Sequence, residues 1–437
     1  MMDGVKIAGH FLTARYRRRF LNRESLETHQ KRELERFRKR VLEHVDYYKS
    51  CADLPLSDFP IMDKPSYQDN FAGLNTLGIS YANAYDLAQK AAIDGRSASI
   101  EGITIGMSTG TSGNRGLFLV SPRERLKWLG TVLAKAVPDV ILRPQRIALM
   151  LAANSDLYKT VRQSPHYQFR FFDLFKGVDS HLSELENYTP TILIGTAQAL
   201  TLLAQARKLG NITFNPRKII SGGEVLDPQD QRIIEDAFGL SIDQIYQCTE
   251  GFFGMTCPHG SIHLTEDCVL FEKEWVDQEN GKFVPLITDF SRDTQAMVRY
   301  RMNDILTELP DPCPCGSPLT AISRIEGRCD DCFVIPNSIG ADMTTVLPDV
   351  IRNTVVDCAV TIDDFRILQL SPTHIEIQLP DTCHDDIGSL VQGRLETLVD
   401  SLGCMKPKFK HTRGIEVSVA SKLRRVRRCF DLDEVRR

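Results

Sequence analysis

From residue 122 to residue 247, short runs of consecutive apolar residues alternate with longer segments that carry apolar residues at helical spacing. Such runs are typical of strands buried on both faces, and the spaced segments are typical of amphipathic helices. The runs predict strands at residues 146–153, 169–172, 191–195, 218–221 and 242–247. The spaced segments predict helices at residues 122–137, 181–187, 200–209 and 228–238. Strands that alternate with helices indicate a mostly parallel sheet covered by helices on both faces.

The pattern changes on both sides of this region. Residues 9–50 combine dense Glu, Lys and Arg with apolar residues at helical spacing, so we expect helices there. The arginines in this part are Arg15, Arg17, Arg18, Arg19 and Arg23. They are most simply a solvated helix face, with partner binding as the alternative. Residues 260–325 instead hold shorter β-like pieces, at 269–272, 284–288 and 295–300.

The last hundred or so residues predict a separate compact domain. Its strands are expected at residues 365–370, 376–379 and 415–419, and its helices at 347–355 and 387–402. We therefore expect an α/β fold with two domains. The large N-terminal domain, 1–329, has mostly parallel sheets covered by helices and a small β-rich subdomain at about 255–325. The small C-terminal domain, 330–437, is α+β.

Composition limits the classes of partner. The chain has 437 residues and a net charge of -4, which gives no reason to expect nucleic acid or a membrane surface as partner. No apolar run approaches the roughly 18 residues of a membrane span, and the N-terminus does not read as a secretory signal. We therefore expect a cytoplasmic protein. In that reducing compartment its 12 cysteines should be thiols or metal ligands.

A loop rich in glycine and hydroxyl residues lies between two β-like segments, 102–105 and 117–120. It reads Ser108-Thr109-Gly110-Thr111-Ser112-Gly113. Such a loop lets backbone N–H groups and hydroxyls approach an anion closely. It lacks the Gly-Lys-Ser/Thr end of a Walker loop. The residues alone leave two interpretations open, a phosphate-binding loop and a hairpin turn.

Two further polar segments follow predicted strands, where ligands of open α/β sheets bind. The first is the turn Gly222-Gly223-Glu224, whose glycines let the backbone approach a flat ring. Its alternative is a tight strand-to-helix turn with Glu224 near the start of the next helix. In the second segment, Tyr246 offers a stacking face, Thr249 a hydroxyl and Glu250 an oxygen ligand for Mg²⁺.

In this order, these segments resemble the motifs of the adenylate-forming enzymes, the superfamily of acyl-CoA synthetases, peptide-synthetase adenylation domains and luciferases. The resemblance runs from about residue 55 to 428 and is strongest toward phenylacetate-CoA ligases and deazaflavin-adenylating synthetases. It implies that the loop at 108–113 binds the phosphates of ATP. It also implies that the Gly222-Gly223-Glu224 turn lies along adenine. Thr249 would contact the α-phosphate, and Glu250 would bind Mg²⁺.

The resemblance assigns roles nearer the C-terminus as well. Asp304 would hold the ribose hydroxyls, Arg328 would contact the ribose or a phosphate, and Asp330 would be the pivot of a mobile C-terminal domain. Lys422 matches the catalytic lysine, although Ser421 stands where phenylacetate-CoA ligases have glycine. The alternative for this basic segment is a solvated tail.

Soft ligands occur in two knuckle-like turns. Cys257, His263, Cys313 and Cys315 together suit a tetrahedral structural Zn²⁺. A rival set joins Cys313 and Cys315 to Cys329 and Cys332, and His259 and Cys268 are spare candidates. A chain without metal is the remaining alternative.

The resemblance implies ATP-dependent activation of a carboxylic acid through an acyl-adenylate, with transfer to coenzyme A or a carrier-protein thiol. Phe252 and Phe253 favour an aryl acid, although core packing explains them equally well. The acyl pocket is expected near Asn154, Tyr158, Gly195, Thr196, Phe252 and Gly254. Two other functions stay open: adenylyl transfer to a cofactor hydroxyl, and nucleotide binding without turnover. A homodimer is compatible with all three.

Overall fold

The computed structural model describes residues 2–93, 98–107, 116–140, 142–152, 167–358, 362, 364–415 and 422–432. The loop at 108–113, Asn154 and Tyr158 therefore lie outside the described residues. The chain divides into two compact units. The first is formed mainly by Met1–Met302 and Thr307–Arg324, and the second by Asn303–Leu306, Ile325–Ser418 and Lys422–Arg437. No helix among the described residues is long and apolar enough to cross a membrane.

Parallel strands form the centre of the first unit. They are β4 (Gln145–Leu151), β5 (Tyr167–Asp173), β6 (Ile192–Gly195), β7 (Lys218–Gly222) and β8 (Ile242–Gln247). Neighbouring strands bring apolar residues into register, as in the pairs Ile147↔Ile192 and Ile219↔Ile242. The helices around them are α5 (Pro122–Ala136), α7 (Leu182–Tyr188), α8 (Ala197–Lys208) and α9 (Pro228–Phe238). The predicted alternation of strands and helices is confirmed.

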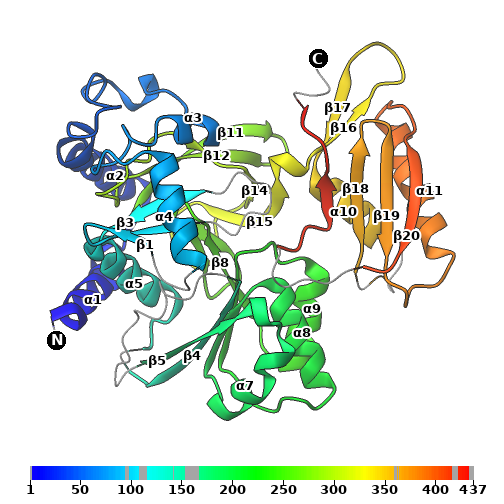
Figure 1. Ribbon diagram of the computed structural model, residues 1–437, viewed down its shortest axis with the longest axis horizontal. Helices are drawn as coiled ribbons and strands as arrows, with labels where there is room; N and C mark the ends of the chain where they lie inside the picture. Colours follow the sequence, from blue (N-terminus) through cyan, green and yellow to red (C-terminus); the bar gives the residue numbers. More distant parts are fainter. Residues whose placement is uncertain are drawn as a thin grey trace. The chain divides into compact units, whose positions relative to one another are not determined.

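Successive strand residues face opposite cores, because side chains alternate along a strand. Leu193 and Ile219 pack in one core with residues of α7, α8 and α9. Ile192 and Ile220 pack in the other with residues of α5 and with Phe11 of α1 (Met2–Leu12). Figure 1 shows α8 and α9 on one side of these strands and α1 and α5 on the other. The sheet is covered on both faces, as the continuous apolar runs predicted.

The β-rich region predicted at 255–325 continues the same sheet. β9 pairs antiparallel with β8, and the strand order is β11-β12-β14-β15-β10-β9-β8-β7-β6-β4-β5. The added strands are β9 (Phe252–Thr256), β10 (Ile262–Leu264), β11 (Val269–Asp277), β12 (Lys282–Asp289), β13 (Tyr300–Arg301), β14 (Asp304–Glu308) and β15 (Ala321–Arg328). The strand predicted at 295–300 is wrong, since only Tyr300 lies in a strand. Gln295 makes an isolated bridge to Asn75 instead.

Ion pairs between arginines and buried acids attach the N-terminal segments to the first unit. After α1 come α2 (Arg23–Phe37), α3 (Lys64–Asp69) and α4 (Tyr81–Ile93). Arg18 lies 3.6 Å from the Asp267 carboxylate, and Arg23 lies 2.8 Å from the Glu266 carboxylate. Both acids are almost fully buried, with exposed fractions of 0% for Asp267 and 2% for Glu266. The expectation of a solvated arginine face is therefore wrong for Arg18, whose side chain is 17% exposed, whereas the Arg23 side chain is 46% exposed.

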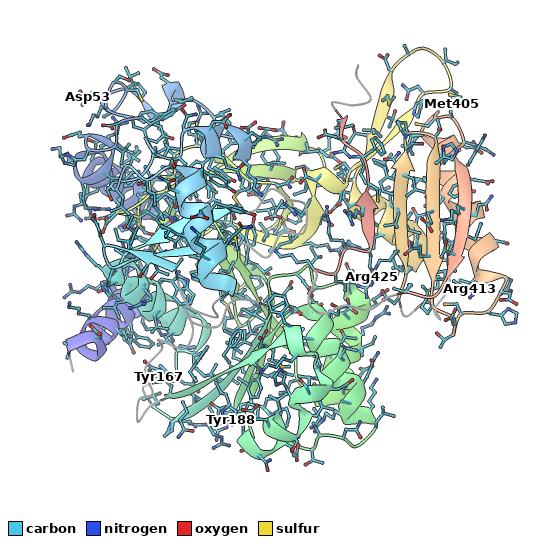
Figure 2. The ribbon with its side chains drawn as sticks, in the orientation of Figure 1. Asp53, Tyr167, Tyr188, Met405, Arg413 and Arg425 are labelled. Atoms are coloured by element: carbon cyan, nitrogen blue, oxygen red, sulfur yellow. The ribbon has the colours of Figure 1, made fainter. Side chains whose placement is uncertain are left out.

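The second unit has its own sheet and core. Its elements are β16 (Phe333–Pro336), β17 (Met343–Val346), α10 (Pro348–Val356), β18 (Arg366–Ser371), β19 (His374–Leu379), α11 (Ile387–Ser401), β20 (Lys408–Arg413) and β21 (Val426–Arg428). The four-stranded sheet has the order β20-β19-β18-β21. Figure 2 labels Arg413, the last residue of β20, and Met405, which lies before that strand in the sequence. Phe365, Ile367, Val391 and Leu395 are buried in the core between sheet and helices.

Candidate active site

A cavity of the first unit collects segments that are far apart in the sequence. Thr249 and Glu250, which follow β8, lie in its wall. The space between its walls, with the open solvent at its mouth included, is about 340 Å³. Its lining comprises Lys64, Tyr67, Gln68, Phe71, Tyr81, Gly116, Leu117, Phe118, Thr249, Glu250, Met297 and Tyr300. The cavity therefore joins the predicted Thr-Glu segment to α3, α4 and the end of the Gly-rich loop.

The base of that loop is a β-hairpin. β2 (Ile103–Met107) and β3 (Leu117–Val120) pair antiparallel, with Met107 opposite Leu117. Gly116, the described residue directly before β3, lines the cavity. Gly106 lies beneath the Phe118 ring, and a Cβ atom there would meet that ring at 1.9 Å. A side chain at this position would require the Phe118 ring to move.

Hydrogen bonds orient Glu250. The Tyr300 hydroxyl donates to Glu250 Oε1 at 3.4 Å, and Arg292 Nη2 donates to the Glu250 carbonyl oxygen at 2.5 Å. Burial and the nearby Glu250 carboxylate raise the pKa of Tyr300 well above its ordinary value. Tyr300 therefore stays protonated and remains a donor at physiological pH. The Glu250 carboxylate is held in one direction within a cavity that also offers the Thr249 hydroxyl.

Lys64 is a candidate that was not among the predicted site residues. It is the first residue of α3, whose N-cap Asp63 accepts a hydrogen bond from the Ser66 amide at 2.9 Å. The preceding residue, Met62, forms a bridge to Tyr300. The bridge places the start of α3 near Tyr300, whose hydroxyl bonds Glu250. Lys64 lines the same cavity as these two residues. The Asp-Lys-Pro start of a helix was the available signal, but its distance in sequence from Glu250 hid the connection.

The Gly222-Gly223-Glu224 turn begins at the end of β7, after the predicted strand. Gly222 ends β7, and Gly223 has a φ of +83°, a conformation that favours glycine. Glu224 Oε2 accepts a hydrogen bond from the Gln198 amide at 3.1 Å, at the start of α8. Glu224 stands four residues before Pro228, the first residue of α9, so the alternative of a strand-to-helix turn with Glu224 near the next helix stays open. A carboxylate at a helix N-terminus is favourable, and contact with adenine stays a prediction.

Tyr246 is more buried than a ring that is free to stack on a ligand would be. Its exposed fraction is 5%, and its ring centroid lies 5.6 Å from that of Phe253 in an edge-to-face contact. Phe253 is fully buried, so core packing accounts for it. Stacking of Tyr246 on adenine stays a prediction.

The remaining predicted residues belong to the second unit. Asp304 is the first residue of β14. Arg328 ends β15, and its Nη2 atom lies 3.8 Å from Asp330 Oδ2. Asp330 also accepts a hydrogen bond from Asn303 Nδ2 at 2.5 Å. Lys422 is exposed. Their contacts with nucleotide stay predictions.

Four soft ligands meet in the first unit. The ligand atoms of Cys257, His263, Cys313 and Cys315 all lie within 4.8 Å of one another. The Cys257 and Cys313 sulfurs are 3.6 Å apart, and Cys315 Sγ lies 3.3 Å from His263 Nε2. Tetrahedral zinc places neighbouring ligand atoms about 3.6 Å apart. The favoured set of ligands therefore converges at a spacing that suits Zn²⁺.

The surroundings of this cluster also suit a metal. His263 Nδ1 donates to the Leu319 carbonyl oxygen at 3.0 Å, which leaves Nε2 facing the sulfurs. Burial would raise the pKa of Cys313, but hydrogen bonds from the Cys315 backbone and the His263 side chain lower it to about 6. Burial and the nearby sulfurs raise the pKa of Cys315 to about 11. The thiols thus oppose each other's ionisation, and a cation among them would relieve that repulsion.

The spare candidates lie elsewhere. Cys268 accepts a hydrogen bond from Arg18 at 2.7 Å and contacts Asp267. His259 is exposed, although its amide donates to Cys257 Sγ at 3.4 Å. Neither belongs to the cluster that the described residues form.

Comparison with solved structures identifies the fold. The crystal structure of 2-hydroxyisobutyryl-CoA ligase in complex with 2-HIB-AMP matches with a TM-score of 0.67 and 15% identity over 94% of this chain and 91% of that chain. The chain has the fold of the adenylate-forming ligases. The amide bond synthetase of Marinactinospora thermotolerans matches with a TM-score of 0.51 and 15% identity over 74% of this chain and 67% of that one.

Curated sequences agree with this adenylate-forming fold. The indoleacetate–lysine synthetase of Pseudomonas savastanoi is 29% identical over 139 residues, which are 31% of this chain and 34% of that protein. The phenylacetate-coenzyme A ligase of Pseudomonas putida is 25% identical over 228 residues, which are 48% of this chain and 51% of that protein. The match thus spans about a third of one relative and half of the other. No protein-family profile matches the chain. The resemblance to adenylate-forming enzymes is confirmed.

Proposed function

We propose that this chain uses ATP to convert a carboxylic acid to an acyl-adenylate and then transfers the acyl group to a thiol. The observation that carries the proposal is the cavity shared by Thr249, Glu250 and Gly116. It brings the predicted α-phosphate contact and the predicted Mg²⁺ ligand to the base of the predicted phosphate loop. The adenylate-forming fold supports the same function.

In the first step, a carboxylate oxygen of the acid attacks the α-phosphorus of ATP. The bond from this phosphorus to the bridging oxygen of the β-phosphate breaks, and pyrophosphate leaves with the bonding electrons. In the second step, the sulfur of a thiol attacks the acyl carbon, the bond to the phosphate oxygen breaks, and AMP leaves. The thiol proton passes to solvent.

The chain's own residues position and neutralise charge in this scheme. Glu250 is the residue that would hold Mg²⁺, because it lines the cavity and hard oxygen ligands suit this ion. Bound Mg²⁺ would supply neutralisation of the phosphate charge. Thr249 would donate to the α-phosphate, and Lys64 would add a second positive charge. Lys422 would meet the carboxylate and phosphate oxygens as charge moves between them.

The names of the relatives favour an aryl-substituted acid. Phenylacetate and indoleacetate both carry an aromatic ring on an acetate group, and each is named in one curated relative. For the acceptor, coenzyme A or a carrier-protein thiol is the first candidate. An amine is the second candidate, because one relative is named for lysine and one structural neighbour is named an amide bond synthetase.

An exchange assay tests the function. The purified chain is incubated with ATP, Mg²⁺ and labelled pyrophosphate, with phenylacetate, indoleacetate, benzoate, acetate or an amino acid as the substrate. We expect label to enter ATP with at least one aryl acid, and we expect Glu250→Gln to remove that signal. Tight ATP binding without exchange for any acid would favour a nucleotide-binding protein without turnover. Adenylylation of a cofactor hydroxyl would favour the remaining alternative.

We also propose that Cys257, His263, Cys313 and Cys315 hold a structural Zn²⁺. Metal analysis of the purified chain should give about one zinc per molecule. Cys315→Ser should lose the zinc and lower the melting temperature, whereas Cys51→Ser, a cysteine outside the cluster, should change neither. Zinc-free protein with an unchanged melting temperature would remove the site.

A further inference from the structure

The basic segment that carries Lys422 is fastened within the second unit by two ion pairs. Arg424 contacts the Asp331 carboxylate with two nitrogens: Nε donates to Oδ2 at 2.9 Å, and Nη2 donates to Oδ1. The next residue, Arg425, donates from Nε to Asp364 Oδ1 at 3.1 Å. Figure 2 labels Arg425 directly before β21. From Arg424 to Cys429 the segment is therefore not a solvated tail.

A strand completes the attachment. β21 pairs in parallel with β18, and the Ile367 amide donates to the Arg425 carbonyl oxygen at 2.7 Å. The Cys429 amide donates to the Gln369 carbonyl oxygen at 2.8 Å. These bonds fix the chain after Arg425, and the Arg424–Asp331 pair extends the fixed part by one residue toward Lys422.

The Arg424–Asp331 pair is largely shielded from water. Asp331 has an exposed fraction of 4%, and the Arg424 side chain has one of 22%. Burial raises the pKa of the Asp331 carboxyl, and Arg424 opposes that shift. A two-pronged contact between guanidinium and carboxylate fixes orientation as well as distance. Loss of either partner would leave a shielded charge without its counter-ion.

Asp331 belongs to the segment predicted as the hinge. It ends the short helix Cys329–Asp331, directly before β16. This helix is itself held, because the Cys329 amide donates to the Asn303 carbonyl oxygen at 2.8 Å. Lys422 is exposed and stands two residues before Arg424. Two residues of extended chain span at most about 7 Å, so the lysine begins close to the pair.

We propose that Asp331 and Arg424 are positioning residues for Lys422, and that their ion pair ties the base of the lysine segment to the hinge. The inference rests on the proposed function, because it assumes that Lys422 acts in adenylation. The pair would set where the lysine side chain starts, and the lysine would move with the hinge segment as one piece. A displacement of about 1 Å in a positioned group can slow a reaction by up to about 100-fold.

The activity test uses the full chain and the acid found by the exchange panel. Arg424→Gln and Asp331→Asn should each lower kcat of pyrophosphate exchange 10- to 100-fold, with KM for ATP changed less than 3-fold. Transfer from added acyl-adenylate to the acceptor should stay within 3-fold of wild type. Arg424→Lys keeps the charge but loses the two-nitrogen contact with Asp331. Its kcat should lie between those of wild type and Arg424→Gln. Arg427→Gln, an exposed arginine on β21, is the matched control.

A charge-swap double variant distinguishes positioning of Lys422 by this ion pair from a general structural role of the two residues. Combining Asp331→Arg with Arg424→Asp should restore at least a third of the exchange lost in the single variants. Where that double variant does not fold, the graded loss from Arg424→Lys to Arg424→Gln decides the question. Arg424→Gln exchange equal to that of Arg427→Gln would overturn the inference. Equal loss in exchange and in transfer from the added adenylate would also overturn it.

Hydrogen exchange needs no substrate, so it tests the ion pair independently of the proposed function. Hydrogen exchange of residues 422–428 should be at least 10-fold faster in Asp331→Asn than in wild type, with β19 unchanged. If wild type shows no pyrophosphate exchange with any acid, the proposed function fails while this readout still tests the anchor. Unchanged protection of residues 422–428 would overturn the anchor itself.

Discussion

At the residue scale, the cavity depends on a few side chains that act on one another. The Tyr300 hydroxyl donates to the Glu250 carboxylate, and Arg292 donates to the Glu250 carbonyl oxygen. The sequence could identify Glu250, because the Thr-Glu pair follows a predicted strand, the Gly-rich loop and the Gly-Gly-Glu turn in the order that resembles the adenylate-forming enzymes. It could not identify Tyr300 as its donor, because that contact joins positions 50 residues apart.

The first prediction concerns this donor. Tyr300→Phe removes the hydroxyl and keeps the ring, so the packing against Tyr67 should survive. We expect kcat/KM for pyrophosphate exchange to fall about 10-fold, which corresponds to about 1.4 kcal/mol, the scale of one hydrogen bond to a charged group. The Mg²⁺ concentration for half-maximal rate should rise. Tyr16→Phe, an exposed tyrosine outside the cavity, should leave both values unchanged.

The second prediction concerns Lys64. If its ammonium faces the phosphates of ATP, Lys64→Met should raise KM for ATP about 10-fold, because the change removes charge and keeps most of the apolar length. High salt should weaken ATP binding less in this variant than in wild type. Lys49→Met changes a lysine whose side chain is 53% exposed and should have no effect. Equal ATP affinity in wild type and Lys64→Met would exclude Lys64 from the site.

At the element scale, the N-terminal helices are joined to the loop before β11 through buried charge. The Asp267 carboxylate lies 3.6 Å from Arg18 Nη1 and 2.9 Å from Lys135 Nζ of α5. The Asp267 backbone oxygen lies 3.0 Å from His29 Nε2. The helical periodicity of residues 9–50 could be predicted. The anchor could not, because an arginine on a helix looks the same in sequence whether it meets water or a buried carboxylate.

The third prediction tests the anchor through its pH dependence. Burial raises the pKa of Asp267, but Lys135 and Arg18 outweigh burial and hold it below its ordinary value of 3.8. A carboxyl with a depressed folded-state pKa stabilises the fold above that ordinary value, and the contribution is lost as pH falls through the folded-state pKa. Asp267→Asn should therefore cost about 3 kcal/mol or more at pH 7. The difference from wild type should shrink below pH 4.

Urea unfolding at several pH values measures this effect. Asp46→Asn is the matched control, since the Asp46 side chain is 81% exposed beside Lys49. It should shift the urea midpoint very little at any pH. A cost for Asp267→Asn that stays constant down to the lowest pH at which the protein is folded would contradict the charge pairing.

Apolar pattern explains which elements could be predicted. The buried parallel strands and helices α8, α9 and α11 have strong periodicity, and each lies within a few residues of its predicted place. β20 was missed because Lys-Phe-Lys-His-Thr-Arg is almost entirely polar, and this edge strand pairs only with β19. β21 was missed because Val-Arg-Arg reads as part of a basic tail. Both are held by neighbours that the local sequence does not reveal.

At the scale of the whole molecule, the predicted chemistry is divided between two units with separate cores. The first unit carries the cavity with Thr249 and Glu250, and the second carries Lys422. Leu203 is fully buried against the parallel sheet of the first unit. Leu395 is 1% exposed and packs in the core of the second. Because the cores are separate, we expect a destabilising substitution in one unit to lower the stability of that unit alone.

The fourth prediction tests this division with a matched pair of variants. Leu203→Ala and Leu395→Ala each remove a buried leucine side chain, which typically costs about 2–5 kcal/mol. In calorimetry we expect Leu203→Ala to lower one unfolding transition and Leu395→Ala to lower another. Leu395→Ala should keep wild-type ATP affinity at a temperature where its own unit is still folded. If both variants lower a single transition by the same amount, the two cores unfold as one, and the chemistry is not divided between independently stable parts.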